Sequence, residues 1–587
     1  MEPFVLLDDA RPGGSARLYR DPVDVVEATR PDGIAAALDQ IRRATRDGLH
    51  VAGFLGYEAG EAFEPGAGPM PAPAAPLAWF GLFRDWAAVD AAAWLPDAGG
   101  GWIGAPVPLT DADGYQAQVR AALDLIAAGD LYQVNLSFRA GVATAGDPLA
   151  LYAGLRARAG AGYGAAIWTG ADMLLSLSPE LFFTLDRDRL TCRPMKGTAP
   201  RGDTPGADVA AARALAADEK NRAENLMIVD LLRNDLSRVA APGSVAVPDL
   251  FRVETYPTVH QLTSTVTATL APGRDAADML AAAFPCGSIT GAPKVRAMQA
   301  IAAIENAPRG PYCGAIGRID ADGDAAFNVA IRTLHLGPSE DGGEGVGAGG
   351  NGGRATLSLG AGIVADSDPA AEWRECLAKG AFVGDGTPGF DLLETMAFDP
   401  EAGLMRLDAH LARMKASAAC FGFAFDRHAA RNELQAATFR LRGAARVRLA
   451  LGASGAVAVE VAPMPPAPDR ALRVAVVPLP VPPADLRLRH KTADRHFYDA
   501  ARAAAGTDEV VFEHDGALTE GSFTSLFADR GDLLVTPAAG PLLPGVLRGE
   551  LLAGGRAVEG RVTRADLSGG FWLGNALRGL MRAELAL

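Results

Sequence analysis

Two glutamates in AEWRECLAK have a spacing that suits binding of a hard cation. Glu372 and Glu375 stand three residues apart, so a helix places both carboxylates on one face. Neighbouring carboxylates repel each other unless water, a cation or a base lies between them. Magnesium binds few protein carboxylates and keeps coordination positions for water and substrate. The spacing alone is consistent with either a solvated acidic face or a magnesium site. Glu224 in ENLMIVDLLRND is a further candidate ligand.

Two turns that precede helical segments could bind anions through backbone N–H groups. Glycines frame GSITG at 287–291 before the run KVRAMQAI, and Pro544-Gly545 stands before VLRGELL. Free N–H groups at the start of a helix attract negative charge. The GxxxxGK[ST] pattern of a P-loop is absent from the first turn, so it is not a phosphate loop of that type. By itself, GSITG is also typical of a tight turn.

Two lysines stand where an amine could do chemistry. Lys196 follows a strand-like run in RPMKGT, and Lys491 lies between a basic stretch and a helical one in RHKTADRHFYDAARA. A lysine attacks only in its uncharged form, whereas its reference pKa is about 10.4. Burial or cationic neighbours must therefore lower the pKa of a nucleophilic lysine. Taken alone, Lys196 is also consistent with a solvated lysine.

The elements that must position these residues are mixed helices and strands. Segments with helical periodicity are 112–130, 217–239 and 408–423. Strand-like runs are 172–179, 180–186, 189–195, 446–452 and 473–480. Because both halves of the chain contain both kinds of element, the pattern predicts an α+β or α/β protein.

A glycine tract at 341–353 invites interpretation as a linker between domains. AAFNVAIRTLHL before it and ATLSLGAGIVAD after it are both rich in strand formers, which predicts one hairpin with the tract at its tip. We therefore place the boundary after the helical stretch PAAEWRECLAKGAFV, giving domains at 1–382 and 383–587. PGAGPMPAPAAP at 65–76 is expected to be a loop.

Composition restricts the class of function. The chain has 587 residues, of which 49% are hydrophobic and 21% charged, a globular balance. The net charge of −15 disfavours nucleic acid or an anionic membrane as partner. No basic n-region, spanning apolar stretch or CxxC pair occurs, and a cytoplasmic location is expected. The odd number of scattered cysteines predicts no disulfide framework; they are Cys192, Cys286, Cys313, Cys376 and Cys420.

Nine motifs in family order resemble the chorismate-utilising enzymes, the large subunits of anthranilate, isochorismate and aminodeoxychorismate synthases. They are GDLYQVNLS (129–137), SPELF (178–182), RPMKGTAPRG (193–202), AENLMIVDLLRNDLSRV (223–239), VHQLTS (259–264), GSITGAPK (287–294), AIRTL (330–334), GAGIVADS (360–367) and ExxEC (372–376). The resemblance covers about residues 1–382. Lysine at 196, where anthranilate synthases have a small residue, is similar to aminodeoxychorismate synthase component I.

This resemblance implies a role for each matching position. Lys196 would attack carbon 2 of chorismate, and Glu180 would act as general acid or base. Glu224 and Glu375 would bind magnesium, while Glu372 would hold a metal-bound water. Contacts to the ring carboxylate, the departing group and the substrate carboxylates would come from His260, Arg332, Thr290, Lys379 and the backbone of Gly360, Ala361 and Gly362.

A second set of motifs resembles the fold-type IV pyridoxal-phosphate enzymes, which include amino-acid aminotransferases and aminodeoxychorismate lyase. The motifs are ETM (394–396), HLARM (410–414), HKTADRHFYD (490–499), TEGSFTSLF (519–527), LPGVLR (543–548) and GNALRG (574–579). By this resemblance Lys491 would hold pyridoxal 5′-phosphate and shuttle protons, and Glu520 would pair with the pyridine nitrogen. The phosphate and substrate positions would be Arg413, the backbone of Val546 and Leu547, and Asn575.

The two resemblances imply an α+β chain in which a large chorismate-enzyme β-sandwich with helices precedes a smaller fold-type IV α/β domain. They imply 4-aminobenzoate synthesis for folate: magnesium-dependent amination of chorismate, then elimination of pyruvate. No glutaminase nucleophile elbow of the GxCxG type occurs, so we expect a separate glutamine amidotransferase subunit to supply ammonia. An anthranilate or isochorismate synthase domain joined to an aminotransferase or an inactive scaffold stays open, as does oligomerisation through the second domain.

Overall fold

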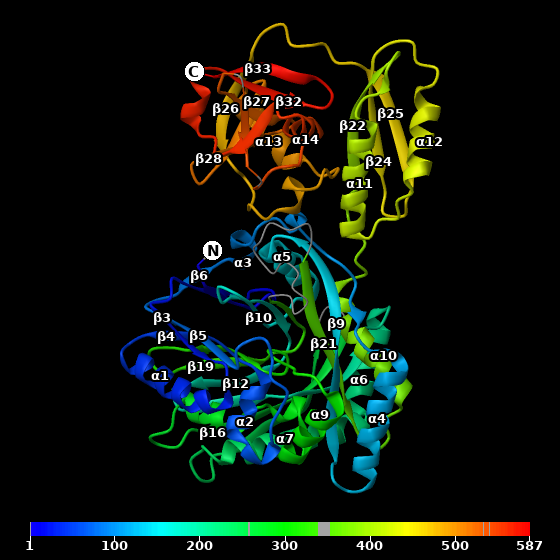
Figure 1. The fold of residues 1–587 in the computed structure, drawn as a ribbon. Coiled ribbons are helices and arrows are strands. Elements are labelled where there is room, and N and C mark those ends of the chain that lie inside the picture. Colours follow the sequence, from blue (N-terminus) through cyan, green and yellow to red (C-terminus); the bar gives the residue numbers. More distant parts are fainter. Residues whose placement is uncertain (1, 256–258, 338–352, 532, 539, 587) are drawn as a thin grey trace.

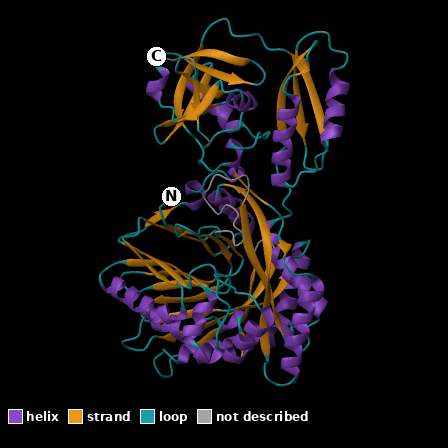
Figure 2. Ribbon diagram, viewed as in Figure 1, coloured by secondary structure: helices purple, strands orange, loops and turns teal. Residues whose placement is uncertain are grey.

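The computed structural model describes all of the chain except residues 1, 256–258, 338–352, 532, 539 and 587. Four β-sheets and the helices around them make up the described residues (Figures 1 and 2). Two sheets belong to the first domain and two to the second. Among the described residues, no helix combines the length and the apolar character that crossing a membrane requires.

The first sheet forms one layer of a sandwich and has 11 strands among the described residues. Its longest pairing joins β9 to β21 in antiparallel register, with Ser137 opposite Gly360 and Asn135 opposite Gly362. The path of the sheet is β17 (Gly291–Ala292), β9 (Gln133–Gly146), β21 (Gly353–Ile363), β20 (Thr333–Leu336), β11 (Met173–Ser178), β10 (Tyr163–Trp168), β1 (Phe4–Asp8), β2 (Ala16–Arg20) and β6 (Ala87–Val89), with β7 (Gly101–Ile103) and β8 (Val107–Pro108) beside β9.

The second sheet forms the other layer and has 10 described strands. In order these are β14 (Met195–Pro200), β16 (Val259–Thr269), β13 (Arg189–Arg193), β12 (Leu181–Asp186), β19 (Ala325–Val329), β18 (Ala315–Ile319), β4 (His50–Leu55), β5 (Ala78–Phe83) and β3 (Asp24–Ala28), with β15 (Ala246–Thr255) beside β16. Lys196 lies on β14, at one end of this path.

Side chains from both sheets share one apolar cluster, which holds the two layers together. Val5 and Ile167 of the first sheet and Phe54 and Trp79 of the second are all 0–1% exposed. Alternate residues of β1, such as Leu6, belong to another buried cluster, so this strand is covered on both faces. The predicted β-sandwich with helices is confirmed.

Helices cover the outer faces of the sandwich (Figure 1). The predicted helical segments 112–130 and 217–239 are confirmed as α4 (Ala112–Ala127) and α7 (Glu219–Ser237). Each begins after an aspartate side chain that accepts a hydrogen bond from a first-turn N–H group, Asp111 from Gly114 and Asp218 from Asn221. The others are α1 (Ile34–Arg46), α2 (Gly60–Phe63), α3 (Ala91–Trp94), α5 (Pro148–Ala159), α6 (Pro205–Ala217), α8 (Ala276–Ala283), α9 (Lys294–Glu305) and α10 (Pro369–Gly380).

The strands that flank the glycine tract pair as predicted, because Leu334 on β20 lies opposite Leu357 on β21. Most of the tract itself lies outside the described residues. The strand-forming run AAFNVAIRTLHL contains two strands, β19 and β20, rather than one continuous strand. The chain leaves the second sheet after β19, turns at Arg332 with a φ of 50°, and enters the first sheet as β20. Alternation continues through the break, so periodicity alone does not reveal a change of layer.

The second domain consists of two lobes (Figure 1). The first lobe has the sheet β23 (Gly403–Leu404), β22 (Leu392–Asp399), β24 (Ala445–Leu451) and β25 (Val457–Pro463), with α11 (Leu407–Phe421) and α12 (Arg427–Thr438). The second has β28 (Ala517–Gly521), β27 (Glu509–His514), β26 (Leu472–Pro478), β33 (Gly579–Leu585), β32 (Phe571–Asn575), β29 (Ser525–Asp529), β30 (Leu534–Pro537) and β31 (Ala557–Gly560), with α13 (His496–Ala505) and α14 (Val546–Ala553). Strand β26 runs parallel to β27 and β33, as in an α/β sheet.

We predict that Gly291→Ala destabilises the first domain by about 3 kcal/mol, because two costs combine. Gly291 has a φ of +143°, and a Cβ there would lie 2.2 Å from the carbonyl oxygen of Gln133. Gly206→Ala is the matched control, since nothing lies within 4 Å of its Cβ position on α6. Thermal unfolding of the two variants measures the difference, and equal transition temperatures would contradict the prediction.

Candidate active sites

Lys196 lies in a half-buried position where four charged side chains act on its amine. A Cβ added at Gly362 would lie 3.0 Å from Lys196 Nζ, which places the amine against strand β21. Burial lowers the pKa of Lys196, and the positive charge of Lys379 lowers it further. Glu224, Glu180 and Glu375 oppose this shift without cancelling it. The site thus moves the amine toward the uncharged form that nucleophilic attack requires.

Glu180 lies in the turn between β11 and β12 and is 5% exposed. Burial raises its pKa to about 7, although a hydrogen bond from Ser288 and the charge of Lys196 act in the other direction. The Ser288 hydroxyl donates to Glu180 Oε1 at 2.7 Å, and Ser288 belongs to the 3₁₀ turn η5 (Gly287–Ile289) inside GSITG. A carboxyl group with a pKa near neutrality can both give and take a proton. The turn therefore orients an acid rather than a phosphate.

Three glutamates from two helices influence one another electrostatically, and two of them, Glu224 and Glu375, also act on the Lys196 amine. Burial raises the pKa of Glu224 on α7, and the negative charges of Glu375 and Glu372 on α10 add to that rise. Glu372 is 9% exposed, whereas the Glu375 side chain is 56% exposed, so of this pair Glu372 is the one that departs from a solvated acidic face. Lys379 Nζ lies 2.8 Å from Glu375 Oε1 and donates to the carbonyl oxygen of Gly360 at 2.9 Å.

These acids suit a divalent cation in chemistry, although their oxygen atoms are not converged. Among the described residues, no choice of one carboxylate oxygen each from Glu224, Glu372 and Glu375 places all three oxygens within 4.8 Å of one another. Neighbouring carboxylates help to raise the pKa of Glu224 and of Glu372, whereas Lys379 lowers the pKa of Glu375; a cation would remove the repulsion among the acids. The donor set therefore fits magnesium with carboxylates from two helices.

Gln133, which the motif analysis did not single out, has both side-chain amide atoms buried, and neither has a hydrogen-bond partner among the described residues. It is 1% exposed at the start of β9, and its Nε2 would lie 2.7 Å from a Cβ at Gly362, next to Lys196 Nζ. Buried amides are nearly always satisfied, so two open positions beside a reactive amine indicate a ligand site. A glutamine inside a strand buried on both faces was the available sequence signal.

Four of the predicted substrate-site residues make contacts with other parts of the first domain. His260 has both ring nitrogens engaged, Nε2 with Asp208 Oδ1 at 2.9 Å and Nδ1 with Thr255 Oγ1 at 3.0 Å. The Thr290 hydroxyl donates to the carbonyl oxygens of Cys286 and Gly287 within its own turn. The carbonyl of Arg332 accepts from the N–H of Leu177 where the chain changes layers. Ala361 lies between Gly360 and Gly362 on β21 and pairs with Leu136.

Lys491 forms the centre of a second site in the other domain. Its backbone carbonyl accepts from the N–H of Leu393, and its Nζ lies 3.2 Å from Thr395 Oγ1, so both contacts come from β22. Burial lowers the pKa of Lys491 to about 7, and the charges of Arg413, Arg495 and Arg448 contribute while Glu394 opposes them. At neutral pH this amine is close to equally charged and uncharged, which suits covalent attachment of a carbonyl compound.

Glu394, also absent from the predicted set, aims Arg413 at the start of α14. Arg413 donates to both carboxylate oxygens of Glu394, at 2.8 and 2.7 Å, and to the carbonyl of Pro544 at 2.9 Å. Burial alone would raise the pKa of Glu394, but Arg413 and His410 outweigh it and lower that pKa to about 2. His410 Nδ1 is hydrogen-bonded to Glu394, and the buried Nε2 of His410 has no partner in the described part of the chain.

The first turn of α14 has the properties of an anion site. Gly545 precedes the helix without a side-chain cap, so the N–H groups of Val546 and Leu547 keep no such partner. A Cβ at Gly545 would lie 2.5 Å from Ser525 Oγ, so any other residue here would displace that hydroxyl. With the guanidinium of Arg413 beside Pro544 and the open Nε2 of His410, the described residues fit a phosphate-bearing cofactor held covalently by Lys491.

Glu520 on β28 is buried and hydrogen-bonded rather than ion-paired. It accepts from the Tyr498 hydroxyl at 2.6 Å and from the N–H of Leu543 at 2.9 Å. Burial raises its pKa to about 7, so a positive charge from a ligand would strongly favour its ionised form. Asn575 Oδ1 accepts hydrogen bonds from the N–H groups of Leu577 and Arg578, so this oxygen stabilises the turn that follows Asn575.

Comparisons with known proteins divide the chain at the same place as its sheets. Residues 2–384 match the family model described as chorismate binding enzyme, and residues 391–585 match the model of amino-transferase class IV. The aminodeoxychorismate synthase component 1 of Salmonella typhimurium is 44% identical over 265 residues, covering 45% of this chain and 55% of that protein. The anthranilate synthase component 1 of Streptomyces coelicolor is 44% identical over 272 residues, covering 46% and 50%.

The chain spans about half the length of these curated relatives. Among solved structures, anthranilate synthase component I from Streptococcus pneumoniae aligns with a TM-score of 0.54 at 26% identity, covering 63% of this chain and 92% of that one. Overall identity is thus the same toward relatives that carry two different names, and individual site residues must distinguish between them.

We predict that Glu180→Gln stabilises the first domain at pH 8 relative to the unchanged chain, but not at pH 5. The folded pKa of Glu180 is about 7 against 4.5 for the ordinary group, so folding favours its protonated form and stability falls as pH rises between these values. The gain reaches at most about 3 kcal/mol above pH 7. Denaturant unfolding at the two pH values measures it; a gain independent of pH would contradict the assigned cause.

Proposed function

The chain belongs to the chorismate binding enzymes and carries an amino-transferase class IV domain over residues 391–585, and from this premise we propose that it makes 4-aminobenzoate from chorismate in two steps. The first step is amination of chorismate to 4-amino-4-deoxychorismate, and the second removes pyruvate. The observation that carries this proposal is the Lys196 amine, held in a site that lowers its pKa. We also propose that the two domains meet near residues 383–390.

In the first step, Lys196 Nζ attacks carbon 2 of chorismate while both ring double bonds shift and the carbon 4 hydroxyl leaves. Ammonia then adds at carbon 4, both double bonds shift back, and the lysine leaves carbon 2. Glu180, with a pKa of about 7, protonates the departing hydroxyl so that it leaves as water. The unsatisfied amide of Gln133 supplies a donor and an acceptor to the substrate beside Lys196.

Glu224 and Glu375 would hold magnesium in this site, with Glu372 beside them. When bound, magnesium binds a substrate carboxylate and offsets the charge of the acids. Lys379 lies 2.8 Å from the partly exposed Glu375 and donates to the carbonyl oxygen of Gly360, so its amine lies on the strand surface where a substrate carboxylate would bind. Arg332 and His260 are proposed as further substrate contacts on the strength of the family motifs alone.

The second step is proposed for the Lys491 site. When bound, pyridoxal phosphate stabilises the negative charge that forms at carbon 4 as the proton is removed. Arg413, Val546 and Leu547 would bind its phosphate, and Glu520 would pair with the ring nitrogen. Lys491, with a pKa of about 7, can take the proton from carbon 4 at neutral pH. Asn575 lies at the edge of this site and is proposed to line the substrate side.

Ammonia is proposed to come from a separate glutamine amidotransferase subunit, which the component 1 name of the Salmonella relative supports. We place the chain in the cytoplasm, since Cys192, Cys286, Cys313, Cys376 and Cys420 are all free in the described structure. Incubation of the purified chain with chorismate, magnesium, ammonium and pyridoxal phosphate tests the whole proposal. Para-aminobenzoate is the expected product, ortho-aminobenzoate would assign anthranilate synthesis instead, and glutamine in place of ammonium should give neither.

We predict that Lys196→Ala lowers the rate of amination at carbon 4 by about 10³-fold or more, because it removes the group that forms the covalent bond. Lys415→Ala is the matched control, since Lys415 is exposed on α11 in the other domain. Chromatography of the products at saturating ammonium measures the rate. Full activity in Lys196→Ala would rule out the covalent scheme.

We predict that Lys491→Ala loses the absorbance near the edge of the visible range that the unchanged chain acquires with pyridoxal phosphate. The variant removes the only amine described within hydrogen-bond distance of Thr395 in that site. It should accumulate 4-amino-4-deoxychorismate while Lys415→Ala behaves like the unchanged chain. An unchanged spectrum and unchanged 4-aminobenzoate formation in Lys491→Ala would assign the second domain another role.

A further inference from the structure

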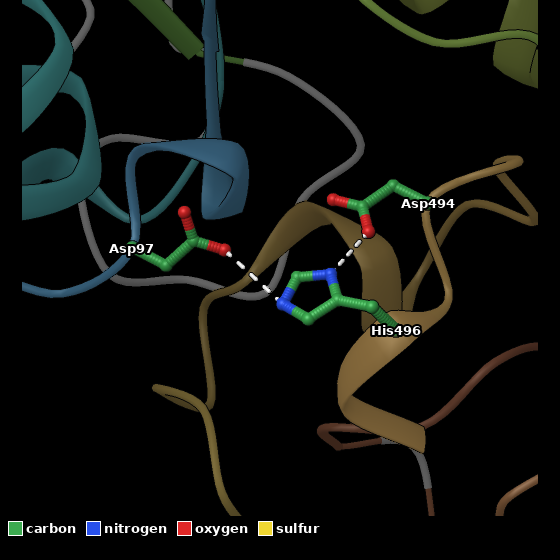
Figure 3. A group of neighbouring side chains, drawn as sticks. All are labelled: Asp97, Asp494 and His496. Atoms are coloured by element: carbon green, nitrogen blue, oxygen red, sulfur yellow. Dashed lines mark hydrogen bonds and ion pairs between the residues drawn. The ribbon is translucent and has the colours of Figure 1, made fainter. Parts of the chain in front are cut away.

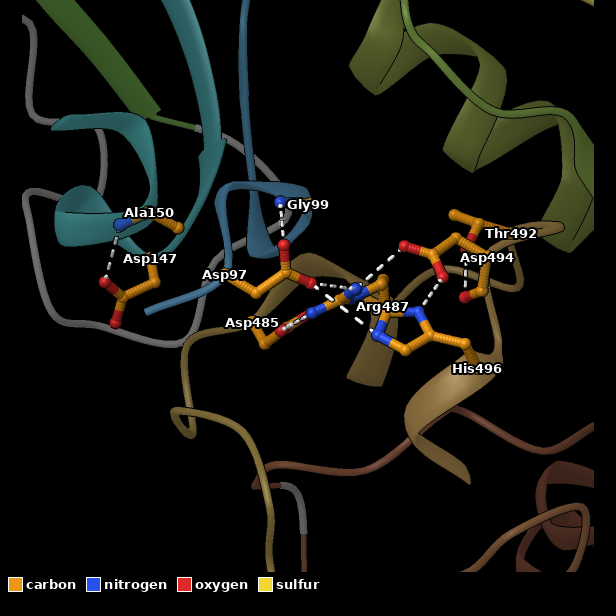
Figure 4. A network of polar contacts seen from close by, with 9 residues as sticks. All are labelled: Asp97, Gly99, Asp147, Ala150, Asp485, Arg487, Thr492, Asp494 and His496. Atoms are coloured by element: carbon orange, nitrogen blue, oxygen red, sulfur yellow. Dashed lines mark hydrogen bonds and ion pairs between the residues drawn. The ribbon is translucent and has the colours of Figure 1, made fainter. Parts of the chain in front are cut away.

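A buried arginine links the two domains next to the Lys491 segment (Figure 4). Arg487 lies in the 3₁₀ turn η7 (Leu486–Leu488), four residues before Lys491, and its side chain is 1% exposed. It donates to both carboxylate oxygens of Asp485, at 3.0 and 2.7 Å. Its Nη1 donates to Asp494 Oδ2 and to Asp97 Oδ2, both at 2.7 Å. Asp97 belongs to the first domain, so one guanidinium joins acids from both.

The same residues also group as a candidate metal site, but their contacts do not support one. Asp97, Asp494 and His496 have ligand atoms within 4.8 Å of one another (Figure 3). The Oδ2 atoms of both aspartates accept hydrogen bonds from the Arg487 guanidinium, whose fixed positive charge would repel a cation at that point. His496 is 66% exposed and pairs with Asp494 Oδ1 at 2.5 Å. We therefore interpret the group as an ion-pair network.

The first domain presents Asp97 from a loop that fits tightly against the second domain. Asp97 immediately precedes η4 (Ala98–Gly100), and the N–H of Gly99 donates to Asp97 Oδ1 at 3.1 Å. This hydrogen bond orients the Asp97 carboxylate. A Cβ at Gly100 would lie 2.7 Å from Asp485 Oδ2, and one at Gly99 would lie 3.0 Å from Arg487 Nη1. Glycine at both positions lets the loop approach the buried arginine directly.

A second contact reaches the lysine segment from the same side. The ring of Trp102, on β7 of the first domain, meets Phe421 edge-on with centroids 5.4 Å apart. Phe421 in turn packs against the ring of His490 at 4.6 Å, and His490 is the residue before Lys491. The indole N–H of Trp102 donates to the carbonyl of Gly386 at 2.9 Å, which fixes its orientation. An aromatic chain thus runs from the first domain to the neighbour of the reactive lysine.

We propose that the first domain positions the lysine segment of the second domain, residues 485–496. Asp97 acts through Arg487 and Trp102 acts through Phe421, so the segment is held at two points before Lys491, and Arg487 also bonds to Asp494 beyond it. Neither residue touches the site itself, and both are positioning residues. The importance of Lys491 rests on the proposed function, whereas the holding contacts do not. A cofactor site in one domain thereby depends on the presence of the other.

The test uses the full chain without added cofactor and the isosteric variant Asp97→Asn. Loss of one charge-assisted hydrogen bond to a buried arginine should speed amide hydrogen exchange over residues 485–496 by about tenfold or more. Asp113→Asn is the matched control, since Asp113 is an exposed aspartate of the first domain on α4. Unchanged exchange in Asp97→Asn, or a rise of the same size throughout the chain, would overturn the proposal.

A second measurement connects this positioning to the chemistry. After addition of pyridoxal phosphate at a fixed concentration, Asp97→Asn should show a severalfold smaller fraction of covalently held cofactor than Asp113→Asn. If the unchanged chain holds no cofactor, the function proposed for Lys491 fails, while the exchange result still decides whether Asp97 orders the segment. If exchange rises but cofactor attachment stays equal, the positioning of Lys491 is overturned.

Discussion

An amine can attack carbon only when it has lost its charge, and this constraint organises both halves of the chain. Lys196 and Lys491 are each placed where burial disfavours the ammonium form, and each has cations nearby that lower its pKa further. The cations differ: a single lysine, Lys379, acts in the first domain, and several arginines act in the second. Arginine keeps its charge at any relevant pH, so the effect of these arginines on the pKa of Lys491 does not change with pH.

Each lysine is matched by a buried glutamate that burial keeps available for proton exchange. Glu180 and Glu520 both have a pKa of about 7, and each is held by hydrogen bonds from neutral groups rather than by an ion pair. Neutral partners orient a carboxyl group without forcing it to ionise, so the group can still respond to a substrate or cofactor. Glu394 shows the contrast, because the arginine fork that it holds lowers its pKa to about 2 and leaves it a permanent anion.

The contact between the domains follows from the same electrostatics. A buried guanidinium must be paired, and Arg487 satisfies its donors with acids from both sides of the junction. Because this arginine stands in the turn that leads to Lys491, the pairing ties the geometry of one site to the surface of the other domain. Small residues at Gly99 and Gly100 permit that approach.

The sequence by itself determined the local features: the helices at 112–127 and 219–237, the hairpin strands around the glycine tract, and the motifs that contain Lys196, Glu180 and Lys491. These depend on periodicity, capping and turn residues, which operate over a few positions. Only the tertiary structure decided which side chains meet. It placed Gln133 beside Lys196, paired His260 with Asp208, moved the chain between layers at Arg332, and set Glu394 behind Arg413. Those contacts depend on the order of strands in the sheets, which joins residues far apart in the chain and is not written in any local pattern.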